Sequence, residues 1–256
     1  AAEVRDLDFE QHFDRKENRK LESFVKYGII AAREAACESG ILDAGLPPEE
    51  IGCITGVGIG GIEFSQNECI KLGKNGPRRT SPLVIPRIIA NIAPGHISID
   101  LGLKGPSFAV VSACAAGTHA IGESCYSILR GDCRAVIAGG CESCICEIGI
   151  AGFGNMQALA SHGYDTPEEA SCPFDAKRSG FVMGEGSGML VLEDYEHARG
   201  RGANILAEII GYGLSSDAYH ITAPSPGGVG GARAMAQAIQ RAGIRPDEVD
   251  YVNAHG

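Results

Sequence analysis

Residues 107–129 read SFAVVSACAAGTHAIGESCYSIL. The first part, SFAVVS, is short and rich in β-branched and aromatic residues, which predicts a strand. The residues from Cys114 to Leu129 are rich in small side chains and predict a helix. This strand–turn–helix junction places Cys114 at the N-terminus of a helix.

Further strands and helices are predicted on both sides of this junction, and no short internal repeat is apparent. The predicted strands are 51–57, 135–138, the end of the glycine-rich segment 180–192, 205–212 and 249–252. The predicted helices are 21–39, 62–72, 86–92, 195–201 and 232–242. Because strands alternate with helices, the sequence predicts an α/β fold in which helices cover the sheets.

Composition excludes several classes of function. The chain has 256 residues and a formal net charge of −10, and it has few aromatic residues, which argues against a nucleic-acid partner. No apolar run reaches the roughly 18 residues of a membrane-spanning helix, so no membrane association is expected. Residues 1–17 are too charged for a secretory signal peptide, which favours the cytoplasm, or a plastid or mitochondrial matrix in a eukaryote.

Cys114 is the first candidate for chemistry. The helix dipole and the free backbone N–H groups at a helix N-terminus favour a thiolate, and the N–H of Cys114 could donate to an oxyanion. The neighbours Ala113, Ala115, Ala116 and Gly117 leave room for an acyl group. The alternative is a plain buried cysteine, the usual state of a free thiol.

His255 is the second candidate, because it follows a predicted strand closely and a histidine there can polarise a carbonyl or accept a proton. The alternative is a solvent-facing loop histidine. The basic residues Arg15, Lys16, Arg19 and Lys20 stand out on an acidic chain and could dock an acidic partner. The alternative for them is a solvated start of a helix.

Two other motifs have weaker functional interpretations. Gly56, Gly58 and Gly61 satisfy G-x-G-x-x-G after a predicted strand, but no acidic residue stands about twenty positions on, so a turn packed beside a pocket is favoured over a dinucleotide loop. Residues 141–146, CESCIC, could bind a metal, yet a zinc site would need a fourth ligand and no second C-x-x-C or H-x-x-x-H occurs. Packing of small residues is therefore favoured over a metal or redox site.

Seven segments carry a resemblance to a known family. They are RKENRKLESFVKYGI (15–29), TGVGIGGIE (55–63), GHISIDLGLKGPS (95–107), SACAAGTHAIG (112–122), PFDAKRSGFVMGEGSGMLVLE (173–193), SSDAYHIT (215–222) and VNAHG (252–256). In this order they resemble the β-ketoacyl-acyl-carrier-protein synthases, the elongating condensing enzymes of fatty-acid synthesis, with synthase II as the nearest type. The resemblance extends over essentially the whole chain.

The resemblance implies a decarboxylative Claisen condensation with no metal or other cofactor. Cys114 would take an acyl chain from acyl carrier protein as a thioester, and malonyl-acyl carrier protein would then lose carbon dioxide and attack that thioester. His255 would be one of two histidines that stabilise the enolate oxygen. Ile59 would lie at the acyl pocket and move for longer chains, and Phe153 would belong to a gating loop near the cysteine.

The resemblance also implies partners and a fold. Lys16, Arg19 and Lys20 would meet the acidic carrier protein, and the protein would be a homodimer with its contact around residues 107–112. The fold would be the thiolase fold, two α/β halves in five αβαβα layers, with residues 1–205 as the first half and 206–256 as the start of the second.

Relative to the family, a first strand ahead of Ala1 and the region with the second histidine and a lysine after Gly256 are missing. We therefore expect these 256 residues alone to lack condensing activity. Two alternatives stay open: a polyketide-type ketosynthase, and a non-catalytic chain-length partner. The presence of Cys114 counts against the second, since such partners lack the active-site cysteine.

Overall fold

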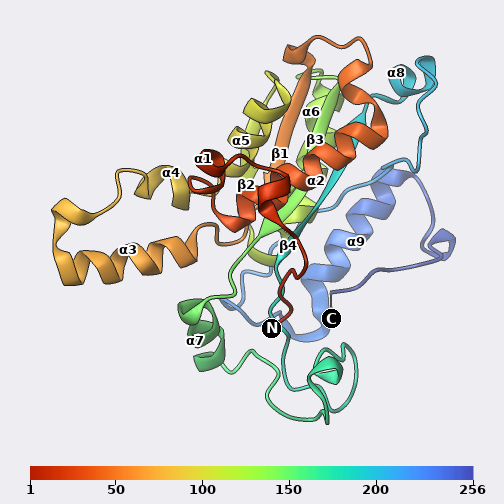
Figure 1. Ribbon diagram of the computed structural model, residues 1–256. Helices are drawn as coiled ribbons and strands as arrows, with labels where there is room; N and C mark the ends of the chain where they lie inside the picture. The colour runs from red at the N-terminus through yellow and green to blue at the C-terminus, as the bar shows by residue number, and fades with distance from the viewer. Residues whose placement is uncertain (256) are drawn as a thin grey trace. The chain divides into compact units, whose positions relative to one another are not determined.

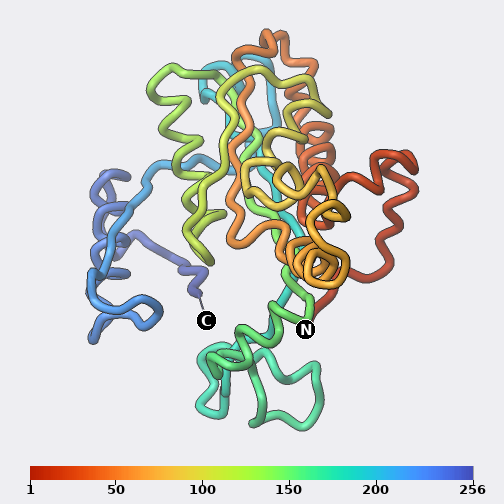
Figure 2. Tube along the Cα trace, turned by 90° about the vertical axis from the view of Figure 1, so that its left-hand side faces the viewer, coloured from red at the N-terminus to blue at the C-terminus, as the bar shows by residue number. Residues whose placement is uncertain are grey.

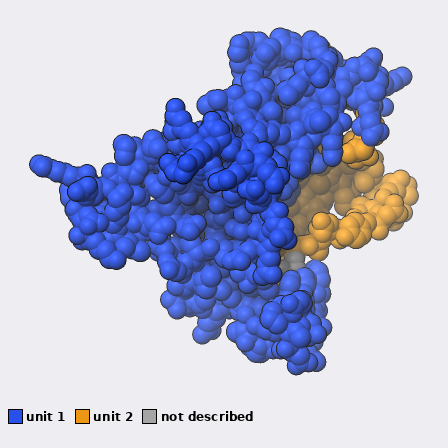
Figure 3. All heavy atoms as spheres, in the orientation of Figure 1, with its two compact units in different colours: residues 1–204 blue, residues 205–256 orange. Residues whose placement is uncertain are grey.

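The computed structural model describes residues 1–255, which belong to two compact units (Figure 3). The first unit comprises residues 1–204 and the second residues 205–256. Within the first unit one four-stranded sheet organises the chain, so the helices are best described by the face of this sheet that they cover.

The sheet has the strand order β2-β1-β3-β4 (Figure 1). Its strands are β1 (Ile51–Gly56), β2 (Ser107–Val110), β3 (Ala135–Glu142) and β4 (Gly186–Glu193). β1 runs parallel to both of its neighbours, and β4 runs antiparallel to β3. The carboxyl ends of the three parallel strands therefore lie at one edge of the sheet.

Successive side chains of the central strands point to opposite faces of the sheet and form two hydrophobic cores. Ile51 and Cys53 of β1 belong to the core under α2 (Ser23–Ser39) and α5 (Ile92–Leu101). Ile54 faces the other way, into the core under α6 (Ala116–Arg130). Figures 1 and 2 show the sheet between these helices. The predicted α/β fold is thus confirmed, with both faces of the parallel strands covered, as parallel sheets require.

The sequence explains the bounds of α2. Phe24, Val25, Ile29 and Ala32 recur at three- to four-residue steps and are all buried. Gly40 ends the helix in the left-handed conformation at φ 64°, where its N–H bonds back to the carbonyls of the last turn. Both features agree with the prediction.

The remaining helices connect these elements, and most of them are short. The α-helices of the first unit not yet named are α1 (Arg15–Asn18), α3 (Ile62–Asn75), α4 (Val84–Ile88), α7 (Glu147–Asn155) and α8 (Tyr195–Gly200). The 3-10 helices are η1 (Phe9–Gln11), η2 (Ile41–Asp43), η3 (Pro48–Glu50), η4 (Pro77–Arg79), η5 (Ala113–Ala115), η6 (Pro167–Glu169), η7 (Pro226–Gly228) and η8 (Pro246–Glu248). The single helix predicted over 86–92 is wrong: two helices occur, and Pro94 lies in the first turn of α5, where its missing N–H costs nothing.

The second unit contains α9 (Val229–Ala242) and a long segment that runs along it. Cβ atoms at Gly211 and Gly213 would lie 2.2 Å and 1.9 Å from carbonyl oxygens of α9, so only glycine permits this approach. The strands predicted at 205–212 and 249–252 are wrong for the described residues, which contain no strand after β4. Extended backbone counts as a strand only when a neighbouring strand pairs with it, and neither segment has such a partner among residues 1–255.

Within the described residues, no helix combines the length and apolar character needed to cross a bilayer.

Gly56→Ala is expected to destabilise the protein by about 1–3 kcal/mol or more, because its Cβ would meet the backbone of α6 at 2.2 Å. Urea unfolding of the variant beside the native protein measures this. Gly73→Ala is the matched control, since no atom lies within 4 Å of its added Cβ and alanine favours the α3 helix by up to about 1 kcal/mol. Equal stability of the Gly56→Ala variant and the native protein would contradict the close approach.

Candidate active site

Cys114 lies in a strained turn between β2 and α6. Ala113 has φ 50°, a left-handed conformation that costs a non-glycine residue roughly 1–2 kcal/mol. The turn continues through η5 into α6, and Cys114 is exposed. The predicted position of Cys114 at a helix N-terminus is confirmed, and the 15-residue helix behind it directs its dipole at this end.

Glycines fix the start of α6 against the sheet. A Cβ at Gly56, the last residue of β1, would lie 2.4 Å from the backbone nitrogen of Gly117 and as close to the carbonyl oxygen of Ala116. A Cβ at Gly140 of β3 would lie 3.4 Å from the Cα of Gly117. Backbone thus packs on backbone at this point, and Cys114 is held at the carboxyl edge of the parallel strands, where ligands bind in open α/β sheets.

A serine and a histidine brace the same turn. The Oγ of Ser112, two residues before Cys114, lies 2.7 Å from Nδ1 of His119 on α6. His119 is not part of a motif that the sequence alone marks as functional. The only available indication was its place one to two helical turns after the cysteine, on the helix that follows.

The loop that carries Ile59 lies beside this turn. A Cβ at Gly58 would be 3.7 Å from the carbonyl oxygen of Ala113. The carboxylate of Glu142, at the end of β3, accepts hydrogen bonds from the N–H of Ile59 at 2.6 Å and from that of Gly60 at 3.2 Å. The structure therefore brings the predicted pocket residue near the predicted nucleophile, and it adds Glu142, which no sequence motif indicated.

Phe153 lies on α7, where its ring packs edge to face against Phe181 at 5.3 Å between centroids. The start of α7 is tied to α3 by one side chain. The amide of Gln66 accepts from the N–H of Ile148 at 2.7 Å and donates to the carboxylate of Glu147. Because α3 follows directly after the Ile59 loop, the elements that carry Ile59 and Phe153 are mechanically linked.

The basic residues gather around α1. Asp14 caps this helix by accepting from the N–H groups of Lys16 at 2.7 Å and of Glu17 at 2.8 Å. Hydrogen bonds from these two backbone groups, with a smaller contribution from nearby lysine charges, lower the pKa of Asp14. The cap presents Arg15, Lys16, Arg19 and Lys20 around one shallow hollow of about 350 Å³.

The cysteines of CESCIC behave as packing residues. Cys141, Cys144 and Cys146 are buried, and burial is the largest cause of the raised pKa of the first two thiols. A Cβ at Gly28 would lie 3.3 Å from the Sγ of Cys141, so α2 lies directly on this thiol. Among residues 1–255 no group of histidine, cysteine, aspartate and glutamate side chains is arranged to hold a metal ion.

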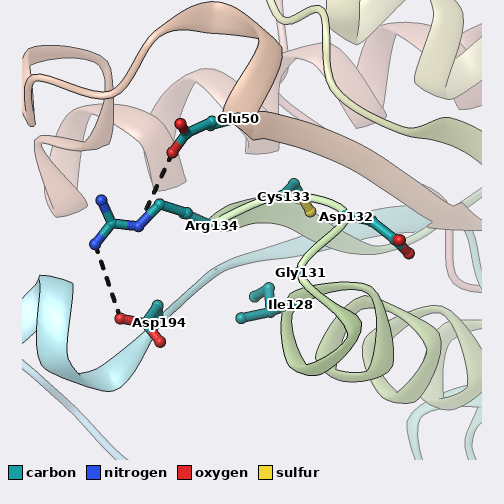
Figure 4. Close-up of a pocket in the computed structure, with 7 residues that line it drawn as sticks. All are labelled: Glu50, Ile128, Gly131, Asp132, Cys133, Arg134 and Asp194. Atoms are coloured by element: carbon teal, nitrogen blue, oxygen red, sulfur yellow. Dashed lines mark ion pairs between the residues drawn. The ribbon is translucent and has the colours of Figure 1, made fainter.

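A larger hollow of about 390 Å³ lies at the opposite edge of the sheet, where Arg134 extends between Glu50 and Asp194 (Figure 4). The ion pairs are loose, at 3.9 Å and 4.0 Å. Glu50 and Arg134 directly precede β1 and β3, so this hollow is at the amino end of the parallel strands. Cys133 there is buried with its pKa raised to about 11 by burial and Asp132, which makes it a poor nucleophile.

His255 is exposed and belongs to the second unit. Residues 242–249, AGIRPDEV, repeat the pattern of residues 44–51, AGLPPEEI, and in both copies a 3-10 helix leads into extended backbone. The expectation that the chain has no short internal repeat is therefore wrong at these residues. In this alignment His255 takes the place of Val57, the first residue after β1, so it holds the same local position as the start of the Ile59 loop.

Comparisons with known proteins agree with this arrangement. The family model described as "Beta-ketoacyl synthase, N-terminal domain" matches residues 2–198, and "Beta-ketoacyl synthase, C-terminal domain" matches residues 206–256. A "3-oxoacyl-[acyl-carrier-protein] synthase 2" of Staphylococcus aureus is 48% identical over 256 residues, which are 100% of this chain and 61% of that protein. One of the same name from Rhizobium meliloti is 49% identical over 247 residues, which cover 94% of this chain and 58% of that protein.

Solved structures give the same result. A β-ketoacyl synthase from Burkholderia phymatum matches all of this chain and 62% of its own with a TM-score of 0.88 at 31% identity. A ketosynthase solved with its type II polyketide synthase acyl-carrier protein matches 91% of this chain and 58% of its own at a TM-score of 0.86 and 29% identity. The thiolase-like fold implied by the resemblance is therefore confirmed.

Exposed and buried thiols are expected to react with iodoacetamide at very different rates. Cys114, Cys37 and Cys69 are exposed, whereas burial raises the pKa of Cys53 to about 12 and, with help from Glu142, that of Cys144 to about 11. A raised pKa means less thiolate, by tenfold for each unit, so at pH 8 the exposed thiols react first. Peptide mass spectrometry after timed labelling measures this order. Labelling of Cys53 as fast as Cys114 would contradict it.

Proposed function

Since the chain belongs to the beta-ketoacyl synthase family, we propose that the protein is a 3-oxoacyl-[acyl-carrier-protein] synthase that carries its acyl chain on Cys114. The observation that supports this most is the exposed thiol at the start of α6, set there by backbone contact with Gly56. The chain spans about 61% of the length of the curated relative from Staphylococcus aureus, so the activity of a whole synthase is a proposal for this protein.

The first step is transfer of the acyl group. The thiolate of Cys114 attacks the carbonyl carbon of an acyl-carrier-protein thioester, and the carrier thiol leaves. The positive end of the α6 dipole favours the thiolate, and backbone N–H groups in the turn can donate to the oxyanion that forms. Ala115 and Gly117 keep side chains small around the reacting sulfur.

The second step is condensation. Malonyl-acyl carrier protein loses carbon dioxide, the resulting enolate carbon attacks the Cys114 thioester, and the thiolate leaves to give a 3-oxoacyl product two carbons longer. His255 is proposed to donate a hydrogen bond to the enolate oxygen. Its place in the repeated 3-10–extended pattern supports this role, since Val57, the matching residue of the first copy, begins the loop next to the Cys114 turn.

The acyl chain is proposed to extend past Ile59, with Phe153 as a gate. Ile59 is 42% exposed although it is apolar, and it stands between glycines on the loop next to the Cys114 turn. Phe153 contacts Phe181 and lies on a helix tied to α3. Because α3 follows the Ile59 loop and bonds to α7, a ligand that displaces Ile59 is expected to displace Phe153 as well.

Two partners belong to the proposal. The basic residues Lys16, Arg19 and Lys20 are proposed to dock the acidic acyl carrier protein. A second copy of the chain is proposed to pair along β2, an edge strand in which Phe108 is 38% exposed and after which Val111 is 62% exposed. A cytoplasmic location fits ten cysteines that are all free.

A polyketide-type ketosynthase is the second candidate function. The ketosynthase matched at 29% identity is described as bound to a hexaketide with its carrier protein, so the same fold serves that chemistry in that protein. The higher identity of 48% to a relative named 3-oxoacyl-[acyl-carrier-protein] synthase 2 favours the first function.

Substitution of Cys114 and of His255 is expected to separate the two steps. The Cys114→Ala variant gains no acyl mass on incubation with a medium-chain acyl carrier protein, whereas the unsubstituted protein does. With His255→Ala, the acyl mass is still added, but condensation with malonyl-acyl carrier protein falls by about 10²–10³-fold, the cost of losing one oxyanion donor. Intact-protein mass spectrometry and product assay measure the two steps.

Cys37→Ser serves as the control for this experiment, because Cys37 is also exposed but lies on α2. This variant keeps the acyl mass. Acylation that persists in Cys114→Ala and is lost in Cys37→Ser would overturn the assignment of the nucleophile.

Reversing charge on α1 is expected to weaken carrier-protein binding. Lys16→Glu raises KM for the acyl carrier protein about tenfold, equivalent to about 1.4 kcal/mol, and the effect shrinks as salt is added. kcat with a small acyl thioester that lacks the carrier stays at the native value. Lys177→Glu, an exposed lysine outside α1, is the matched control. An equal rise of KM in both variants would show a general charge effect and not a docking site.

A further inference from the structure

We propose that Glu142 is a positioning residue that fixes the backbone of the Ile59 loop and thereby sets which acyl chain lengths the protein accepts. The statement about chain length rests on the proposed function, in which Ile59 borders the acyl chain. The clamp itself rests on the geometry of the loop alone.

Glu142 holds the loop from the side of the sheet. It is the last residue of β3, in which six of the seven preceding residues are buried, so its side chain starts from a rigid support. Oε2 accepts from the N–H of Ile59 at 2.6 Å, and Oε1 accepts from the N–H of Gly60 at 3.2 Å and of Ser143 at 3.2 Å. A carboxylate that accepts three backbone N–H groups is fully engaged as an anchor.

Helix α4 holds the loop from the other side. The carbonyl oxygen of Ile88 accepts from the N–H of Gly61 at 3.3 Å, and a Cβ at Gly61 would lie 2.4 Å from the carbonyl oxygen of Arg87. The Nε of Arg87 in turn donates to Glu22 at 2.6 Å, and its guanidinium lies 3.9 Å from the centre of the Phe64 ring. The loop backbone is thus fixed between α4 and Glu142.

The same carboxylate lies close to the Cys114 turn. A Cβ at Gly58 would be 2.9 Å from Oε2 of Glu142 and 3.7 Å from the carbonyl oxygen of Ala113. Residues 58–61 lie between Glu142 and α4. Among them only Ile59 has a side chain, and Ile59 is 42% exposed. A change at Glu142 therefore reaches the site through the position of Ile59.

Loss of one carboxylate oxygen tests this role. In Glu142→Gln the side chain keeps one acceptor and gains an N–H₂ group, so at least one of the N–H groups of Ile59 and Gly60 loses its partner. We expect amide exchange of residues 57–61 to become roughly 2–10-fold faster, the effect of losing one such hydrogen bond. Hydrogen–deuterium exchange with mass spectrometry measures this, with residues 135–138 of β3 as the internal standard.

The activity readout is the ratio of kcat/KM for a long acyl chain to that for a short one. Release of Ile59 is expected to raise the ratio of fourteen-carbon to six-carbon carrier-protein substrates by about fivefold, since one weakened hydrogen bond changes an equilibrium by that order. A purely structural defect would lower both values together and leave the ratio unchanged. Glu168→Gln, which removes an exposed carboxylate on η6, is the matched control.

Each outcome tests one part of the proposal, either the clamp on the loop or its role in chain length. Unchanged exchange at residues 57–61 overturns the clamp, and faster exchange with an unchanged ratio overturns its role in chain length. If the native protein itself takes no acyl group, the proposed function fails while the exchange result still decides the clamp. If exchange at residues 135–138 also rises in Glu142→Gln, Glu142→Asp replaces it, because the shorter side chain withdraws the carboxylate but keeps its charge.

Discussion

The backbone of α6 touches the backbone of β1 at Gly56, and the geometry around Cys114 depends on this contact. No side chain fits there, because a Cβ would lie 2.2 Å from the carbonyl carbon of Ala116. The first turn of the helix is thereby brought to the edge of the sheet, and Cys114, one turn earlier, is left exposed at that edge. A bulkier residue at Gly56 would have to push the helix away and would move the thiol with it.

The direction of the strands then decides what can gather around the thiol. β1, β2 and β3 are parallel, so the Ile59 loop, the Cys114 turn and Glu142 all follow carboxyl ends and meet at one edge. The hollow around Arg134 lies at the amino ends, and Arg134 is only loosely paired there, at 3.9 Å from Glu50 and 4.0 Å from Asp194. Strand polarity therefore favours the carboxyl edge as the place of the candidate site over the larger hollow at the amino ends.

The sequence predicted the elements whose pattern is local. Strand β1, helix α2 with its stop at Gly40, and the turn at Cys114 follow from apolar spacing and glycine, and the structure confirms them. The predicted helix over 86–92 did not anticipate helix α5, in which Pro94 lies in the first turn, where proline is tolerated. The segments 205–212 and 249–252 have strand-like composition, but pairing requires a neighbour that composition cannot supply.

Contacts across the sheet could not be predicted. Glu142 and Ile59 are 83 residues apart, and the bond between them joins a side chain to a backbone N–H, which leaves no periodic trace in the sequence. The repeat of residues 44–51 at 242–249 was in principle visible. In the structure, both copies form a 3-10 helix followed by extended backbone. This shared local structure gives His255 the position that Val57 holds in the first copy.

The glycines of residues 56–61 show how one pattern can serve a different purpose from the one it suggests. Gly60 has φ 82°, and added Cβ atoms at Gly58, Gly60 and Gly61 would approach Glu142 or α4 to within 3 Å. Each glycine is thus required by a neighbouring group of the protein itself. The N–H groups of Ile59 and Gly60 already donate to Glu142, and that of Gly61 donates to Ile88, so these donors are not directed at a ligand. Ile59 contributes the only side chain among residues 58–61, and its hydrocarbon suits an alkyl chain better than the phosphates of a nucleotide.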